Sequence, residues 1–145
     1  MSDTFVSNFM RAAVYVTGME RALAVNTELD ILDSVNLREE DIQSERFTGV
    51  EAIQRAFNSE QYVITNNLKL DPAEAPTTNT NFSDLRVVVA LPLAGHGAIY
   101  LDQPLRNGMV PRENVEKLMA LAGHVIQQNK IELDASELVA IYERM

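Results

Sequence analysis

The sequence predicts one α+β domain in which helices pack on an antiparallel sheet. Three observations predict this class. The length of 145 residues fits one domain, apolar residues recur at helical spacing near both ends, and the centre holds β-branched runs joined by short turns. Hydrophobic residues make up 46% of the chain and charged residues 23%, which is typical of a folded globular protein. A chain of this size buries roughly two-thirds of its unfolded surface, so it can hold its own core.

The first half of the chain predicts a helix, two strands joined by a turn, a charged surface stretch and a second helix. The apolar residues of the first helix recur every three or four positions, and Gly18 ends it. The two strands alternate along their length around a turn that contains Asn26. In order, these segments cover residues 4–16, 20–26, 29–35, 38–45 and 50–58.

The second half predicts a strand, a long polar segment, a hairpin and two helices. The polar segment holds Pro72, Pro76 and a run of Thr and Asn, and segments of this length inside a compact domain are often functional. The β-branched run after it is expected to weaken as a strand at Pro92, and Pro111 lies near the start of the first of the two helices. In order, these segments cover residues 61–65, 66–85, 86–91, 98–102, 111–128 and 134–144.

Charge and cysteine content exclude several classes of function. The chain has 12 Lys+Arg against 21 Asp+Glu, a net charge of -9, which argues against nucleic acid and anionic membrane as partners. It has no cysteine, which excludes disulfides, thiolate metal sites and cysteine nucleophiles. No run of about 18 apolar residues is present, and the first residues do not resemble a signal peptide. We therefore expect a cytoplasmic protein.

Four segments, taken in order, resemble the GAF domain, a family of signalling and sensory domains. The most specific is Arg86-Val87-Val88-Val89-Ala90-Leu91-Pro92-Leu93 followed by Gly97-Ala98-Ile99-Tyr100-Leu101-Asp102, which is similar to the family's S-V-L-x-V-P-L … G-x-L-Y-L-D hairpin. The other three are residues 17–25, residues 35–37 with Phe47 and the helix at 50–57, and residues 62–67 with Asp71-Pro72. The helix that carries Leu118-Met119-Ala120-Leu121-Ala122 matches the family's C-terminal L-x-x-L-A helix. We expect residues 1–145 to form a single GAF-like domain with its core at about 4–130 and a C-terminal helical extension at 131–145.

The resemblance implies a GAF-like α/β sandwich: a central antiparallel sheet of about five to six strands flanked by helices. It places helices on one face of the sheet and, on the other face, a small-molecule pocket that the long loop and a helix close. The implied function is a regulatory domain in signal transduction that senses an unidentified small molecule without covalent attachment, dimerises, or does both. Its partners would be a second copy of the chain and a signalling output domain or partner protein. The alternative is a ligand-free protein–protein interaction and dimerisation module.

Two GAF activities are excluded and a third is disfavoured. Covalent bilin attachment and free methionine sulfoxide reduction both use cysteine in this family, and the chain has none. The cyclic-nucleotide binders carry an Asn-Lys … Phe … Asp-Glu pattern, where this chain has Asp102-Gln103, Val110 and Asn114-Val115. No catalytic set is visible either, because the serines lack a G-x-S-x-G context and the two histidines, His96 and His124, stand alone. We therefore expect no enzyme activity, no cofactor and no metal.

Seven residues near the long polar segment are candidates for ligand binding, because a pocket needs apolar walls and a few polar groups that fix orientation. The candidate walls are Tyr62, Phe82 and Tyr100, and the candidate polar contacts are Asn66, Asn67, Asp84 and Arg86. Each group also has a structural interpretation. The tyrosines are then strand packing, the asparagines cap a turn, and the arginine pairs with Asp84 on the surface.

Seven apolar residues of the terminal helices are candidates for a homodimer interface. They exceed what the cover of a small sheet needs, and a partner helix would bury them. The candidates are Phe5, Phe9, Val16, Val125, Ile126, Leu138 and Ile141.

Overall fold

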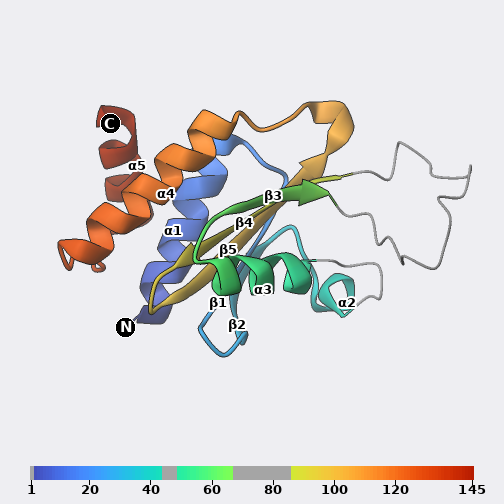
Figure 1. The fold of residues 1–145 in the computed structure, drawn as a ribbon, viewed down its shortest axis with the longest axis horizontal. Coiled ribbons are helices and arrows are strands. Elements are labelled where there is room, and N and C mark those ends of the chain that lie inside the picture. The colour runs from blue at the N-terminus through green and yellow to red at the C-terminus, as the bar shows by residue number, and fades with distance from the viewer. Residues whose placement is uncertain (1, 44–48, 67–85) are drawn as a thin grey trace, which may run out of the picture.

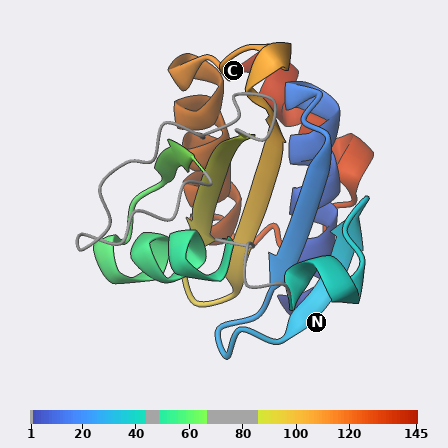
Figure 2. The same cartoon turned by 90° about the vertical axis from the view of Figure 1, so that its right-hand side faces the viewer.

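Five strands form one antiparallel sheet in the order β2-β1-β5-β4-β3. The computed structural model describes residues 2–43, 49–66 and 86–145 (Figure 1). The strands are β1 (Arg21–Val25), β2 (Ile31–Val35), β3 (Val63–Asn66), β4 (Arg86–Leu93) and β5 (Gly97–Pro104). Figure 2 shows the strands side by side in this spatial order, from β3 at one edge of the sheet to β2 at the other. The α+β class and the antiparallel sheet are confirmed.

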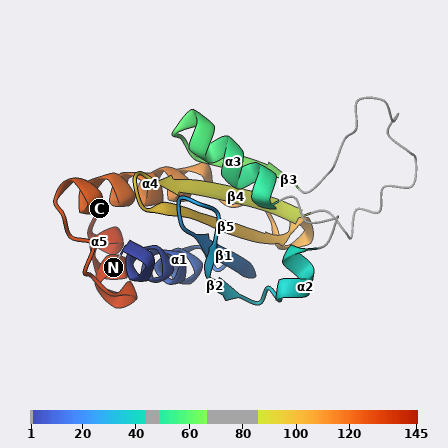
Figure 3. The ribbon, with the colours of Figure 1, turned by 90° about the horizontal axis from the view of Figure 1, so that it is seen from below.

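Helices cover both faces of this sheet. The helices α1 (Ser2–Thr17), α4 (Arg112–Gln127) and α5 (Ala135–Arg144) share one core with one face, which we call the α1 face. The helix α3 (Gly49–Ser59) packs on the opposite face, which we call the α3 face, and Figure 3 shows α1 and α3 on opposite sides of the strands. Two short elements complete the described fold, α2 (Glu39–Ile42) and the 3₁₀ turn η2 (Leu105–Asn107).

Strand alternation divides the core into two clusters. Because successive side chains of a strand point to opposite faces, β4 and β5 each feed both clusters. Val87, Val89 and Leu91 of β4 lie with the helices of the α1 face, whereas Val88 and Ala90 lie with α3. The same alternation decides which of the predicted site residues share a face of the sheet.

Two elements differ from the predictions. β4 does not weaken at Pro92 but pairs through it with Ala98 of β5. β3 begins opposite Ala90, so among the described residues Pro92 has a neighbouring strand on one side only, and a residue without an N–H is tolerated there. The charged stretch at 38–45 contains the helical turn α2, in which the Asp41 carboxylate accepts a hydrogen bond from the Arg38 N–H at 3.0 Å.

Gly97 begins β5 against the backbone of β1. Its φ is +148°, and a Cβ at this position would lie 2.0 Å from the carbonyl oxygen of Val25. The close approach of two backbones therefore requires glycine here, in addition to the turn chemistry that the sequence indicates.

The C-terminal helix belongs to the same core as the rest of the fold. Leu138 is fully buried and Tyr142 nearly so, and α5 packs against both α1 and α4. The Asp134 carboxylate caps α5 by accepting the Glu137 N–H at 2.9 Å, and the Lys117 ammonium lies 4.2 Å from the centre of the Tyr142 ring. Within the described residues, none of the helices is long and apolar enough to cross a membrane.

Candidate functional site

A fully buried carboxylate, that of Asp102, lies on the α3 face of the sheet near the end of β5. Its side chain has no exposed surface. It shares this face with Tyr100 because the two residues are two positions apart in one strand. Buried carboxylates are rare unless they are paired, so the partners of Asp102 define the site.

Arginines from both neighbouring strands pair with Asp102. Arg21 of β1 donates from Nε to Oδ1 at 2.8 Å and from Nη2 to Oδ2 at 2.7 Å. Arg86 of β4 donates from Nε to Oδ1 at 3.0 Å. The Tyr100 hydroxyl donates to Oδ2. The central place of β5 between β1 and β4 brings these groups together, and the carboxylate is satisfied from three directions.

Glu20 completes what we call the Asp102 cluster, which consists of Glu20, Arg21, Arg86, Tyr100 and Asp102. Nη2 of Arg86 donates to Oε1 of Glu20. The exposed fraction of the side chain is 44% for Glu20, 23% for Arg21 and 19% for Arg86. The cluster therefore contains two cations and two anions, with its carboxylate centre buried and the outer parts of its arginines in contact with solvent.

The surroundings keep two of these groups protonated. Burial acts to lower the pKa of Arg21, but the hydrogen bonds and charge of Asp102 outweigh burial and raise this pKa above its usual value. Burial raises the pKa of Tyr100, and the charge and hydrogen bond of Asp102 raise it further. The phenol therefore stays a hydrogen-bond donor to Asp102 throughout the neutral pH range.

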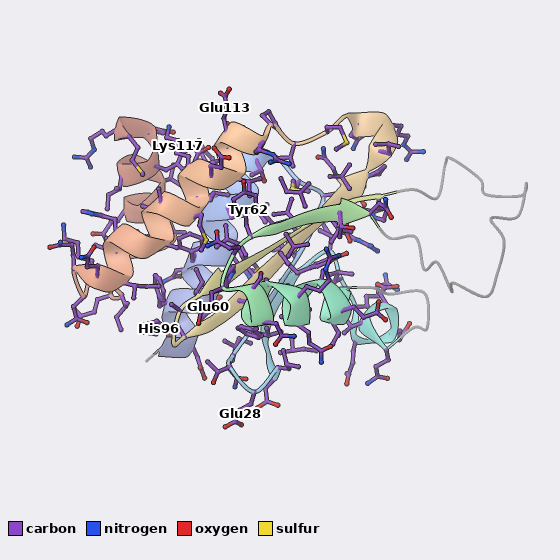
Figure 4. The ribbon with its side chains drawn as sticks, viewed as in Figure 1. Glu28, Glu60, Tyr62, His96, Glu113 and Lys117 are labelled. Carbon is purple, nitrogen blue, oxygen red and sulfur yellow. The ribbon has the colours of Figure 1, made fainter. Side chains whose placement is uncertain are left out.

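The structure brings together only part of the predicted ligand site. Arg86 and Tyr100 meet in the Asp102 cluster. Tyr62 lies on the other face of the sheet, where Figure 4 shows it between β3 and α4, and its hydroxyl donates to Glu116 Oε1 at 3.0 Å. Asn66 lies exposed at the end of β3. The remaining candidates, Asn67, Phe82 and Asp84, lie outside the described residues.

Three members of the Asp102 cluster were missed from the sequence. Glu20, Arg21 and Asp102 were not among the candidate site residues, whereas Arg86 was, with a surface pair to Asp84 as its structural interpretation. An arginine in the otherwise apolar strand Arg21–Val25 was the available signal, because a charged residue beside buried positions needs a counter-charge. The Tyr100-Leu101-Asp102 sequence was a second signal, since it places a phenol and a carboxylate on one face.

Four of the seven candidate dimer residues lie inside one chain rather than on its surface. Phe5, Phe9, Val125 and Leu138 are fully buried, because α5 covers α1 and α4 and supplies the apolar cover that was expected from a partner. Val16, Ile126 and Ile141 are half-buried against the same core. Of the seven, only these three reach the surface of the chain.

The two histidines occupy different surroundings. His96 is half-buried, and its ring packs edge-on against Phe5 with 5.3 Å between ring centres. His124 is exposed in the last turn of α4. Among the residues whose positions the structure gives, no three His, Cys, Asp or Glu side chains gather as a metal site would need.

Comparison of the fold finds a similar solved structure, whereas comparison of the sequence finds no match. No protein-family model matches the chain, and no curated protein matches it. The structure is similar to the crystal structure of a GAF domain/HD domain protein from Geobacter sulfurreducens, with a TM-score of 0.57 and 11% sequence identity over 99% of this chain and 95% of that chain. The chain therefore has a GAF-like fold with a five-stranded antiparallel sheet, and the resemblance noted in the sequence is confirmed for the fold.

Proposed function

We propose that this chain is a regulatory domain of a signalling system that senses a small molecule bound without covalent attachment on the α3 face of its sheet. The Asp102 cluster would form the polar end of the ligand site, with Arg21 and Arg86 as contacts. The observation that supports this proposal is the pair of guanidinium groups held in place by one fully buried carboxylate.

The energetics of the cluster favour a binding role over a purely structural one. A buried ion pair is seldom more stabilising than apolar packing of the same volume, so stability alone does not account for five polar groups at this place. Guanidinium groups with fixed planes suit planar acceptors such as carboxylates and carbonyls. The two arginines also provide local positive charge in a chain of net charge -9. A ligand with acceptor oxygens is therefore the class that we propose.

Thermal denaturation with a panel of nucleotides, amino acids and small carboxylic acids tests the proposal. A ligand at 100 times its Kd stabilises the folded state by about 2.7 kcal/mol, which is a clear rise in melting temperature. The Arg21→Gln variant should lose this rise relative to its own ligand-free melting temperature. Arg106→Gln is the matched control, because it removes the same charge from an exposed residue of η2. If no compound stabilises the wild type, or if Arg21→Gln responds fully, the proposal is wrong.

The second candidate function is dimerisation. The apolar surface that supports it is smaller than the seven candidate residues suggested. It consists of the half-buried Val16, Ile126 and Ile141, to which α1 adds Tyr15 with 73% of its surface exposed. Light scattering across a wide range of protein concentration tests it. A dimer that dissociates in Tyr15→Glu would support this function, and a monomer at every concentration would exclude it.

A further inference from the structure

A hollow lies between α3 and α4, away from the Asp102 cluster. It has a volume of ≈ 560 Å³, within the range of about 300–1,000 Å³ that small-molecule pockets occupy. It borders Pro92 and Leu93 at the end of β4, whereas Arg86 of the cluster is the first residue of that strand. β3 begins opposite Ala90, so no strand of the described residues lies beside β4 on this side at the hollow.

The walls of the hollow are mainly apolar and come from three separate elements. Phe57 comes from α3, Leu93 from β4, and Met119, Ala122 and Ile126 from α4. Phe57, Met119 and Ile126 are only half-buried, so part of their apolar surface faces the hollow rather than the core. A bound apolar group would remove that surface from water.

The hollow stays open because small residues stand between the large ones. Gly95 of the β4–β5 turn and Gly123 of α4 are both among its lining residues. A Cβ added at Gly123 would have no atom within 4 Å, so this helix position has room for a side chain. The glycines at positions 95 and 123 therefore leave the volume of the hollow unfilled.

One charged side chain, that of Glu60, lines the hollow. Figure 4 shows Glu60 near the β4–β5 turn that carries His96. Within the described part of the chain, no Lys or Arg lies within ion-pairing distance of its carboxylate. The lining residues include no Lys or Arg either. Glu60 is exposed, so an anion bound here would be repelled by its negative charge, whereas a cation would be attracted to it.

We propose that this hollow binds a small organic cation, a primary amine with an apolar body. The apolar body would lie against Phe57, Met119 and Ile126, and the ammonium group would pair with Glu60 at the rim. The site is independent of the proposed ligand site at the Asp102 cluster, because it borders the opposite end of β4.

Titration of the ¹⁵N-labelled full chain with three probes of equal chain length tests the proposal. The probes are hexylamine, hexanol and hexanoate, which share an apolar body and differ in the charge of the head group. We expect saturable shifts at the amides that line the hollow, with affinity in the order amine, alcohol, carboxylate. Failure of hexylamine to saturate, shifts centred elsewhere, or equal binding of hexanoate would each overturn the proposal.

Two pairs of variants separate the apolar and the charged contributions. Gly123→Leu fills the hollow and should abolish binding of all three probes, whereas Gly123→Ala adds only a methyl group and should retain binding. Glu60→Gln should weaken hexylamine about two- to five-fold, as expected for a partly exposed ion pair, and leave hexanol unchanged. Glu28→Gln, an exposed residue outside the hollow, is the control for charge. Undiminished amine binding in Gly123→Leu or Glu60→Gln contradicts the assignment.

Discussion

Arg21 and Asp102 lie directly opposite each other in the β1–β5 ladder, and two hydrogen bonds of 2.8 Å and 2.7 Å join their side chains. Both residues stand near the ends of strands that are otherwise apolar on this face. The pair gives Asp102 the bidentate geometry that a guanidinium provides and a lysine does not. It also places Arg21 where Arg86 reaches the same carboxylate from the opposite side.

Asp102→Asn should destabilise the protein by about 3 kcal/mol, because it leaves two partly buried guanidinium groups without their shared counter-charge. Urea denaturation at pH 7 measures this free energy of unfolding. Glu40→Gln removes the same charge from an exposed residue of α2 and should change the stability by less than about 0.5 kcal/mol. Equal stability of the two variants would mean that the Asp102 cluster contributes little.

Tyr100 predicts a loss of stability at high pH. Its folded-state pKa lies above the ordinary value of 10.0, so the phenol stabilises the fold below pH 10 and loses this contribution as the pH rises through the folded-state pKa. Stability of the wild type should therefore fall more steeply between pH 9 and pH 11, a range chosen around the ordinary pKa of about 10, than that of Tyr100→Phe. Tyr62 and Tyr142, whose pKa values are also raised, are common to both proteins. Parallel pH profiles would contradict the assignment of this effect to Tyr100.

Gly97→Ala should be far more damaging than Gly95→Ala, although both glycines lie in or beside the same hairpin. At Gly97 the new methyl group would meet the Val25 carbonyl oxygen at 2.0 Å, and we expect a loss of about 3 kcal/mol or more. At Gly95 no atom lies within 4 Å of an added Cβ, and only the φ of +79° opposes the change, at a cost of about 1–2 kcal/mol. Melting temperatures of the two variants, compared with the wild type, decide between these values.

Asp33 predicts a loss of stability at low pH. Burial acts to raise its pKa, but hydrogen bonds from Ser7 and Arg11 outweigh burial and lower the pKa below 3.8. The ionised group therefore stabilises the fold above pH 3.8 and loses this contribution as the pH falls through the folded-state pKa. Asp33→Asn should cost about 0.5–1 kcal/mol at pH 7, since the pair is partly exposed.

Urea denaturation of wild type and Asp33→Asn from pH 7 down to about pH 3, below the ordinary Asp pKa, checks the sign. The difference between them should shrink as the pH falls. Glu28→Gln, which alters an exposed carboxylate without a side-chain bond in the described structure, should show no such trend. A difference that stays constant with pH would assign the effect of Asp33→Asn to packing rather than charge.

The secondary structure could be predicted because its signals are local. Apolar spacing predicted helices at 4–16 and 50–58, and the structure has α1 at Ser2–Thr17 and α3 at Gly49–Ser59. The exceptions are α2, a single turn of mainly charged residues, and the 3₁₀ turn η2, because both are too short to show a helical period of apolar positions.

The candidate site could be predicted only in part, because its geometry depends on register between strands. Alternation in a strand shows which residues share a face but does not identify the face. The pairing of Val63 with Ala90 puts Tyr62 beside α4, away from Tyr100. The ion pair between Arg21 and Asp102 depends in the same way on the register between β1 and β5. A local sequence pattern does not predict that register. The hollow between α3 and α4 depends on where β3 begins.

Because Gly97 has no side chain, it fixes the register between β1 and β5. If β5 slid past β1 by one residue in either direction, Ala98 or His96 would take the place of Gly97, and its Cβ would collide with the Val25 carbonyl. The same slip would turn Asp102 to the other face and put Leu101 or Gln103, neither of which carries a carboxylate, opposite Arg21. A glycine at one end of the ladder thus selects the partner of an arginine at the other.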